Sequence, residues 1–182
     1  MSTSCLSYRQ VVLRPRETSD IDLLFEWRNN LSELAKWSLR RYPVTREEFQ
    51  AEFEDLERRT VQMRLMIDVK GSTIGTVTSH DYSLVHGWTY VSTYLSPNSR
   101  VRGVGAIVWG LFAPYLFDNF PFRKLYTEIY GFNRLSLKTA QSAGLTLEAQ
   151  IKDRYFWKGK YYDMYLFSLE REQIHKVTRF IL

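Results

Sequence analysis

The feature that most constrains the fold of this chain is a glycine-containing turn between a strand pattern and a helix pattern. The strand pattern covers Trp88–Leu95, and the turn after it reads Arg100-Val101-Arg102-Gly103-Val104-Gly105-Ala106. Glycine lets a backbone approach a ligand closely, and the free N–H groups at a helix start favour an anion such as a pyrophosphate. The turn lacks the Gly-Lys-Ser/Thr of a Walker A loop and the Gly-x-Gly-x-x-Gly of a dinucleotide site. The alternative is a plain strand-to-helix turn with two solvated arginines.

Periodicity on either side of this turn predicts one mixed α/β sheet. The expected strands are Gln10–Arg14, Gln62–Val69, Thr73–His80, Trp88–Leu95, Phe122–Tyr130 and a pair around Lys158-Gly159. The expected helices start near Ile21, after a capping box of Thr45 and Glu48, at Val104 and at Asn133. Pro114 is expected to end or kink the third helix. The order β-α-α-β-β-β-α-β-α-β-β has one parallel crossover, so a doubly wound sheet is excluded.

Length and composition predict a single domain over residues 1–182, with a core of about 10–172 and a C-terminal extension over 173–182. The net charge of +5 attracts anions without choosing among them. The basic residues form no continuous stripe interleaved with aromatics, so no nucleic-acid partner is expected. With Cys5 as the only cysteine, and no signal-peptide or membrane pattern, we expect a cytoplasmic protein without a metal site or membrane contact.

The turn and its surroundings resemble the GNAT acetyltransferase superfamily. Arg100, Gly103 and Gly105 fit in register the Arg/Gln-x-x-Gly-x-Gly/Ala pattern of motif A, which in that family cradles the pyrophosphate of acetyl-CoA. Further segments resemble the family's Asn-x-x-Ser/Ala and Gly-Phe landmarks and its RimJ/RimL-like branch: Asn133-Arg134-Leu135-Ser136, Gly144-Leu145, Leu13-Arg14-Pro15, Glu26-Trp27-Arg28-Asn29 and Gly159–Asp163. The resemblance covers nearly the whole chain, from Val11 to about Glu172.

The resemblance implies a mixed, mostly antiparallel twisted sheet of about seven strands, with a splayed central parallel pair and about four flanking helices. It also implies acetyl-CoA as the acyl donor, with the pantetheine arm along Tyr94, Leu95 and Ser96 and the pyrophosphate on Arg100–Ala106. Asn133 and Ser136 would bind the donor as well. Capping of the next helix explains Asn133 equally well.

Transfer to an amine needs a base for the amine and a proton for the leaving thiolate. Many family members carry a tyrosine seven residues after the asparagine, where this chain has Ala140. Ser136 is the candidate acid here, with packing of the helix on the sheet as its alternative, and Tyr130 is another candidate acid. His80 and Glu128 are the candidate bases, and ordinary solvated strand positions are the alternative for both.

In this family, the loop between the first two helices and the closing hairpin wall the acceptor site. The candidates there are Trp37, Arg40, Tyr42, Tyr155, Trp157 and Asp163. Aromatic rings stack on sugars or bases, and arginines hold phosphate or carboxylate groups. The alternative is that most of these rings belong to the core.

We therefore expect an acetyl-CoA-dependent N-acetyltransferase that acts on a primary amine of a small molecule, such as an aminosugar, a nucleotide-linked sugar or an antibiotic, by direct transfer in a ternary complex. A RimJ/RimL-like protein N-terminal acetyltransferase and a non-catalytic acyl-CoA-binding module are the alternatives. The apolar end Phe180-Ile181-Leu182 is expected to pack on the body or on a second subunit of a homodimer.

Overall fold

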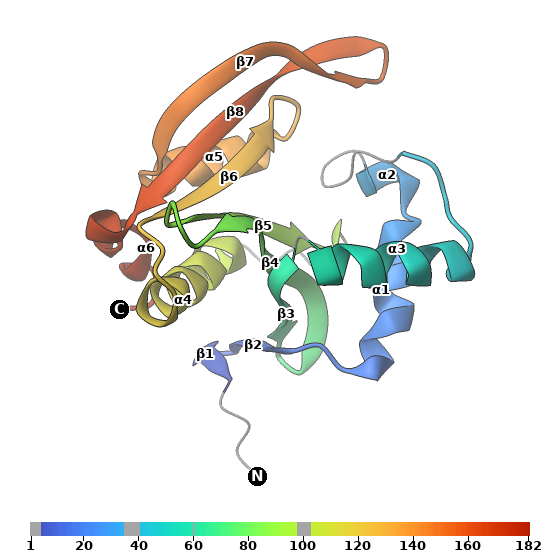
Figure 1. Ribbon diagram of the computed structural model, residues 1–182, viewed down its shortest axis with the longest axis horizontal. Coiled ribbons are helices and arrows are strands. Elements are labelled where there is room, and N and C mark those ends of the chain that lie inside the picture. The colour runs from blue at the N-terminus through green and yellow to red at the C-terminus, as the bar shows by residue number, and fades with distance from the viewer. Residues whose placement is uncertain (1–4, 35–40, 60, 98–102) are drawn as a thin grey trace.

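A computed structural model describes residues 5–34, 41–59, 61–97 and 103–182. Eight strands form one sheet in the order β1-β2-β3-β4-β5-β6-β8-β7, and every neighbouring pair is antiparallel except β5–β6 (Figure 1). The strands are β1 (Leu6–Tyr8), β2 (Val11–Pro15), β3 (Val61–Val69), β4 (Ser72–Ser83), β5 (Trp88–Leu95), β6 (Lys124–Tyr130), β7 (Thr146–Trp157) and β8 (Lys160–Glu170). The predicted mixed, mostly antiparallel sheet is confirmed, with the short β1 added at one edge.

Helices cover both faces of the sheet around β3 and β4, but only one face around β6, β7 and β8. They are α1 (Ile21–Arg28), α2 (Leu31–Leu34), α3 (Arg46–Arg59), α4 (Val104–Asn119), α5 (Arg134–Ala143) and α6 (His175–Thr178). Of these, α4 packs on Ile67, Val77 and Val91, whereas α1 and α3 pack around Met66 on the opposite face. Successive side chains of a strand point to opposite faces, so neighbouring residues such as Met66 and Ile67 pack into two different cores.

The start of α3 follows the predicted capping box. The Thr45 N–H donates to Glu48 Oε2 at 2.8 Å, and the Glu48 N–H donates to Thr45 Oγ1 at 3.2 Å. Val44 and Phe49 are both buried in the cluster under α1 and α3, which is the hydrophobic staple that accompanies such a box.

The sequence predicted that Pro114 ends or kinks its helix. Pro114 does not end it, and α4 continues to Asn119. The proline ring would clash with the carbonyl four residues earlier, at Gly110, which has no side chain to hinder a small adjustment there. Gly110 is needed for a second reason. An added Cβ would lie 3.0 Å from both Val177 O and Ile181 Cγ2, so the C-terminal segment packs directly on this helix.

The two strands of the parallel pair, β5 and β6, diverge toward their C-terminal ends, which confirms the predicted splay. Only Trp88↔Lys124, Thr89↔Leu125 and Tyr90↔Tyr126 are paired, and beyond them β5 and β6 diverge. The long hairpin of β7 and β8 then extends past the body as an arm (Figure 1). Among the described residues, no helix is both long and apolar enough to cross a membrane.

Candidate functional site

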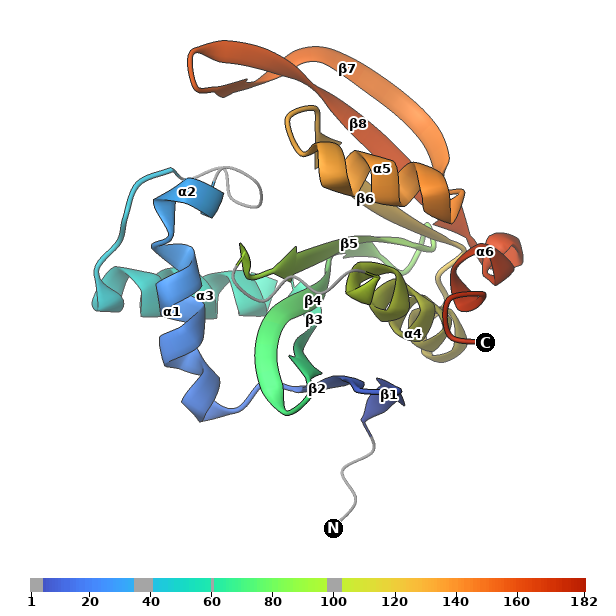
Figure 2. The same ribbon diagram turned by 180° about the vertical axis from the view of Figure 1, so that it is seen from behind.

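Two helices begin at the wide end of the splay. β5 leads into α4 and β6 leads into α5, and because the strands are parallel, both helix N-termini lie at the same edge of the sheet. The two helices pack next to each other on one face (Figure 2). This edge therefore gathers two sets of outward N–H groups, which is the arrangement that an anion requires.

The start of α4 is shaped for close approach by a ligand. Gly103 caps the helix at φ +85°, in the left-handed region that favours glycine. A Cβ added to Gly103 or to Gly105 would meet nothing within 4 Å. Ala106 N–H donates to Gly103 O at 3.1 Å, whereas the N–H groups of Val104 and Gly105 have no acceptor among the described residues. Arg100, Val101 and Arg102 lie outside the described residues.

The main chain of β5 offers hydrogen bonds to the splay at alternate residues. Ser96 N–H donates to Ile74 O at 2.8 Å, and the register runs unbroken from Leu95↔Gly75 to Tyr90↔His80. Bonded residues alternate in an antiparallel ladder, so the peptide groups of Tyr94 and Ser96 turn to β4. Those of Thr93 and Leu95 then face the splay. The predicted pantetheine contacts of Tyr94, Leu95 and Ser96 stay predictions; of the three main chains, that of Leu95 faces the splay.

Thr93 adds a side chain to that path. Among the described residues its hydroxyl oxygen is buried and has no hydrogen-bond partner. A buried hydroxyl without a partner costs free energy, and such groups often mark a ligand position. The amide-bearing arm of CoA fits both this hydroxyl and the free peptide groups beside it.

Asn133 caps α5, and its side chain accepts a hydrogen bond from the Ser136 N–H at 3.4 Å. Both side chains are half-buried at the wide end of the splay. The capping alternative for Asn133 is thus observed, and the predicted roles of Asn133 and Ser136 toward the donor stay predictions. Nearby, burial and a hydrogen bond with Tyr155 raise the pKa of Tyr130 well above its usual range, so its phenol stays protonated.

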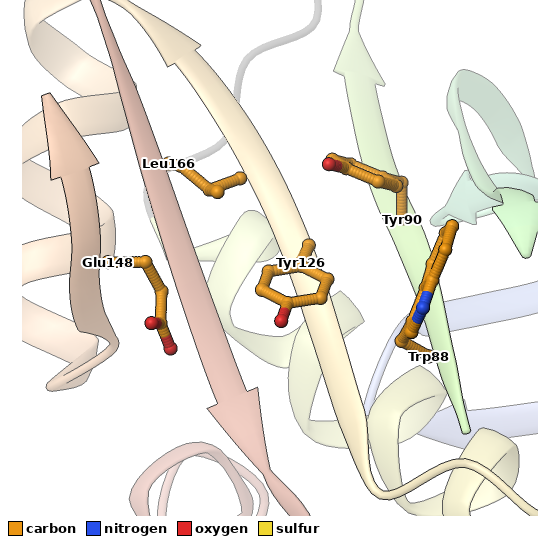
Figure 3. A pocket seen from close by; sticks show the side chains of 5 residues that line it. All are labelled: Trp88, Tyr90, Tyr126, Glu148 and Leu166. Carbon is orange, nitrogen blue, oxygen red and sulfur yellow. The ribbon is translucent and has the colours of Figure 1, made fainter. Parts of the chain in front are cut away.

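The face of the sheet opposite α4 and α5 carries an open pocket below the splay. It has a volume of about 270 Å³ and is lined by Trp88, Tyr90, Tyr126, Glu148 and Leu166. In Figure 3, Tyr90 and Leu166 point toward each other across β6, and the Tyr126 ring lies lower on β6, between Glu148 and Trp88. The Tyr90 and Tyr126 rings are 5.6 Å apart, and they belong to the last paired residues before the strands diverge.

An ionic cluster closes the lower end of the pocket. Lys124 Nζ lies 2.6 Å from Glu148 Oε1 and 3.1 Å from Glu170 Oε1, while Ser168 Oγ donates to Glu148 at 2.6 Å. The hydrogen bond to Glu148 raises the pKa of Lys124, and the same bond lowers the pKa of Glu148. Both groups are therefore charged at neutral pH and their charges compensate each other.

His80 lies at the narrow end of the splay on the same open face. Its Nδ1 is 2.8 Å from Asp81 Oδ2, its Nε2 is 2.8 Å from Ser92 Oγ, and its ring stacks on Tyr90. Glu128 is exposed on β6, two residues beyond the last paired residue, where β5 and β6 have already diverged. The two predicted bases therefore lie on the two strands that flank β5, and their catalytic roles stay predictions.

The residues predicted to bind the acceptor do not gather at one place among the described residues. Trp37 and Arg40 lie outside the described residues, and Tyr42 is exposed. Tyr155 packs against Tyr130 and Trp157 stacks on Phe132, with ring centroids 3.9 Å and 4.5 Å apart. Arg41 donates a hydrogen bond to Phe156 O, so the segment before α3 contacts the arm. The acceptor roles of these residues stay predictions.

The Asp163 carboxylate accepts hydrogen bonds from residues of the β7–β8 arm. Its Oδ2 accepts from Gln150 at 2.5 Å, and its Oδ1 accepts from the Asp153 N–H at 3.1 Å. These bonds lower the pKa of its carboxyl group. Asp163 therefore fixes the bulge of β7 opposite it, and contact with an acceptor would be an additional role.

Sequence reasoning missed Ser92, Thr93 and the Trp88–Tyr90–Tyr126 rings. The strand pattern over Trp88–Leu95 was visible, but alternation alone does not say which of its two faces is uncovered. Only the pairing partners show that one set of side chains faces an uncovered surface. Among the described residues, no group of three His, Cys, Asp or Glu is arranged to hold a metal ion.

Comparison with known proteins agrees with this geometry. Residues 10–146 match the family model described as acetyltransferase (GNAT) domain. No curated protein matches the chain. Among similar solved structures, spermidine N-acetyltransferase from Vibrio cholerae, in complex with CoA and spermine, is 17% identical; 91% of this chain and 98% of that one are covered, with a TM-score of 0.81.

Two further structures share the fold at similar distance. RimL, a ribosomal L7/L12 alpha-N-protein acetyltransferase in complex with CoA, is 15% identical, with 93% of this chain and 99% of that one covered and a TM-score of 0.80. MccE, a microcin C7 self immunity acetyltransferase in complex with acetyl-CoA and AMP, is 15% identical, with 88% and 92% covered and a TM-score of 0.72. These likenesses concern the fold, and the match over residues 10–146 shows that the chain belongs to the GNAT acetyltransferase family.

Proposed function

We propose that this chain transfers the acetyl group of acetyl-CoA to a primary amine of a small molecule whose body lies on the open face of the sheet. One observation carries the proposal: the pocket of Trp88, Tyr90 and Tyr126 begins where the pairing of β5 and β6 ends. A donor entering from the α4 side and an acceptor entering from the open face would therefore meet at the narrow end of the splay.

The donor side is supported by the length of the path. The five steps from Tyr90 to Leu95 span about 17 Å of strand. The pyrophosphate fits the start of α4 at Gly103, and the pantetheine arm fits the peptide groups of Thr93 and Leu95. The thioester, which supplies an activated acetyl carbon, then lies near Ser92 and Tyr90. Relatives with the same fold hold CoA or acetyl-CoA, which supports this donor.

The acceptor side is supported by the chemistry of the pocket. Three aromatic rings offer faces to a sugar ring or to the methylenes of an aliphatic amine, and they attract a cation. The exposed Glu128 adds a negative charge at the opening, where an ammonium group would arrive. A pocket of about 270 Å³ suits a small molecule, such as an aminosugar or an aminosugar-containing antibiotic, better than a folded protein surface.

A panel of acceptors tests this proposal. Purified protein and acetyl-CoA are incubated with glucosamine, with spermidine, with a nucleotide-linked aminosugar or with a peptide that has a free N-terminal serine, and products are identified by mass spectrometry. Acetylation of a small amine is the expected result. Faster acetylation of the peptide would favour the protein N-terminal alternative, and binding of CoA without any product would favour a non-catalytic module.

A glycine pair tests the donor site separately. Gly103→Val places a β-branched residue at φ +85°, so the start of α4 must distort, and we expect calorimetry to show loss of acetyl-CoA binding. Gly71→Val is the matched control, because Gly71 has φ +77° in the β3–β4 turn with equally open surroundings. Equal affinity of the two variants for acetyl-CoA would place the pyrophosphate elsewhere.

A further inference from the structure

Three side chains on the open face form a continuous hydrogen-bonded chain that neither the family match nor the sequence reveals. Asp81 Oδ2 lies 2.8 Å from His80 Nδ1, and His80 Nε2 lies 2.8 Å from Ser92 Oγ. His80 and Asp81 come from β4, whereas Ser92 comes from β5, where Ser92 pairs with Thr78. We propose that this chain is a proton relay: Ser92 takes the proton of the acceptor amine and passes its own to His80, which Asp81 holds in place.

The direction of the relay follows from which groups can donate. An ionised carboxylate only accepts hydrogen bonds, so in the neutral imidazole Nδ1 carries the hydrogen toward Asp81. Nε2 is then the acceptor, and the Ser92 hydroxyl donates to it. The hydroxyl oxygen keeps lone pairs on its exposed side, and these can accept an N–H of an amine arriving from the open face.

The backbone conformation at Asp81 explains how its carboxylate reaches the His80 ring. Asp81 has φ +44°, in the left-handed region that residues with a side chain rarely adopt. The register of β4 and β5 is interrupted between His80 and Ser83, next to this residue. The irregularity places the Asp81 carboxylate beside the ring of the preceding residue, because successive side chains of a regular strand point to opposite faces. Aspartate tolerates the left-handed region better than most residues, which fits its presence here.

The position of the relay agrees with the proposed function, on which this inference rests. Ser92 is two residues beyond Tyr90, the last residue of β5 that pairs with β6. Tyr90, whose ring stacks on His80, feels the charges of Asp81 in the relay and of Glu128 and Tyr126 across the splay. Burial and the nearby Glu128 raise the pKa of Tyr90, so this phenol stays neutral and does not compete for the proton.

The chemical step balances with the groups named. The arriving ammonium gives one proton to Ser92 Oγ while the Ser92 hydroxyl proton moves to His80 Nε2. The neutral nitrogen then forms a bond to the acetyl carbon, the C–S bond of the thioester breaks with its electron pair going to sulfur, and the second nitrogen proton goes to the thiolate. Asp81 stabilises the resulting imidazolium without taking a proton. Ser92 and His80 are thus catalytic residues, and Asp81 is a positioning residue.

The first test reads the tautomer of His80 in the full chain without CoA. The protein has three histidines, so ¹⁵N-labelled imidazoles can be assigned by comparison with His80→Gln and His86→Gln. In the neutral form of the imidazole, we expect His80 to carry its proton on Nδ1. In Asp81→Asn the preference should weaken or reverse. A His80 protonated on Nε2 in the unsubstituted protein would overturn the relay, whatever the enzyme acetylates.

The second test uses initial rates with acetyl-CoA and with glucosamine or spermidine as acceptor. His80→Gln and Ser92→Ala should each lower kcat at least about 100-fold without weakening acetyl-CoA binding, and Ser92→Thr, which keeps the hydroxyl, should recover most of the rate. The control His86→Gln, whose side chain lies in the exposed β4–β5 turn, should leave kcat unchanged.

Two kinetic outcomes contradict the relay. Ser92→Ala with an unchanged kcat would remove Ser92 from the proton path. An acetyl group found on Ser92 by mass spectrometry after rapid quenching would make the serine a nucleophile instead. If the unsubstituted protein acetylates neither amine, the proposed function fails for those acceptors, and the tautomer measurement still decides the relay.

Discussion

Strands β4 and β7 have the same length of 12 residues, but their surroundings differ completely. Six consecutive residues of β4 are buried, from Ile74 to Ser79, whereas β7 has no fully buried residue. β4 lies between two strands with helices on both faces, while β7 is an edge strand with one neighbour. The covered half consists of β1–β3 and the Ile74–Ser79 part of β4. The open half consists of β6–β8 together with the uncovered face at His80 and Trp88–Ser92.

The largest difference between the halves should appear in two phenylalanines. Phe112 on α4 is 1% exposed in the main core, so Phe112→Ala should lower the free energy of unfolding by about 3–5 kcal/mol. Phe156 on the arm is 51% exposed and has Tyr161 as a ring neighbour, so Phe156→Ala should cost about 1 kcal/mol or less. Urea unfolding of both variants checks this; similar losses would mean that the arm is as integral to stability as the core.

Two aspartates, one in each half, extend the comparison to the pH dependence of the free energy of unfolding. Arg14 lowers the pKa of Asp20 by hydrogen bonds of 2.8 and 2.9 Å at a buried position in the covered half. A lowered pKa means that the unfolded chain binds more protons, so this stabilisation is present above the unfolded pKa near 3.9 and is lost as the pH falls through the folded value. Asp20→Asn should therefore cost about 2 kcal/mol at neutral pH and much less at low pH.

The matched variant is Asp163→Asn on the arm. Its pKa is also lowered, by Gln150 first, but the group is exposed to solvent, which screens the interaction. Unfolding followed from about pH 3 to pH 7 should show a clear change of slope for Asp20→Asn and none for Asp163→Asn. The reverse result would show that hydrogen bonds on the arm, rather than the buried ion pair, set the acid stability.

The smallest expected effects concern the helices of the two halves. Thr45→Ala removes the side-chain acceptor from the capping box of α3 and should cost about 1 kcal/mol. The control Thr139→Ala, on an exposed position within α5, removes only a hydrogen bond to the helix's own Leu135 O and should be close to neutral. Thermal unfolding distinguishes the two, and a neutral Thr45→Ala would show that packing of Val44 and Phe49 alone fixes the start of α3.

Much of the fold was accessible from sequence because its signals are local. The capping box of Thr45 and Glu48 lies within one helical turn, and Gly103 marks the helix start by its own backbone preference. Pro114 shows the limit of such local signals. A proline predicts a helix end, but packing of the C-terminal segment on Gly110 and burial of Leu116 and Phe117 keep the helix continuous.

The sequence by itself determined the order of elements, the glycine turn at the start of α4 and the family, since each depends on residues near one another in the chain. Only the tertiary structure decided where β5 and β6 part, which peptide groups face the splay, and that Ser92 reaches the ring of His80. Those features arise from register between strands. A shift of one residue in that register would turn every side chain to the other face, and no local pattern records it.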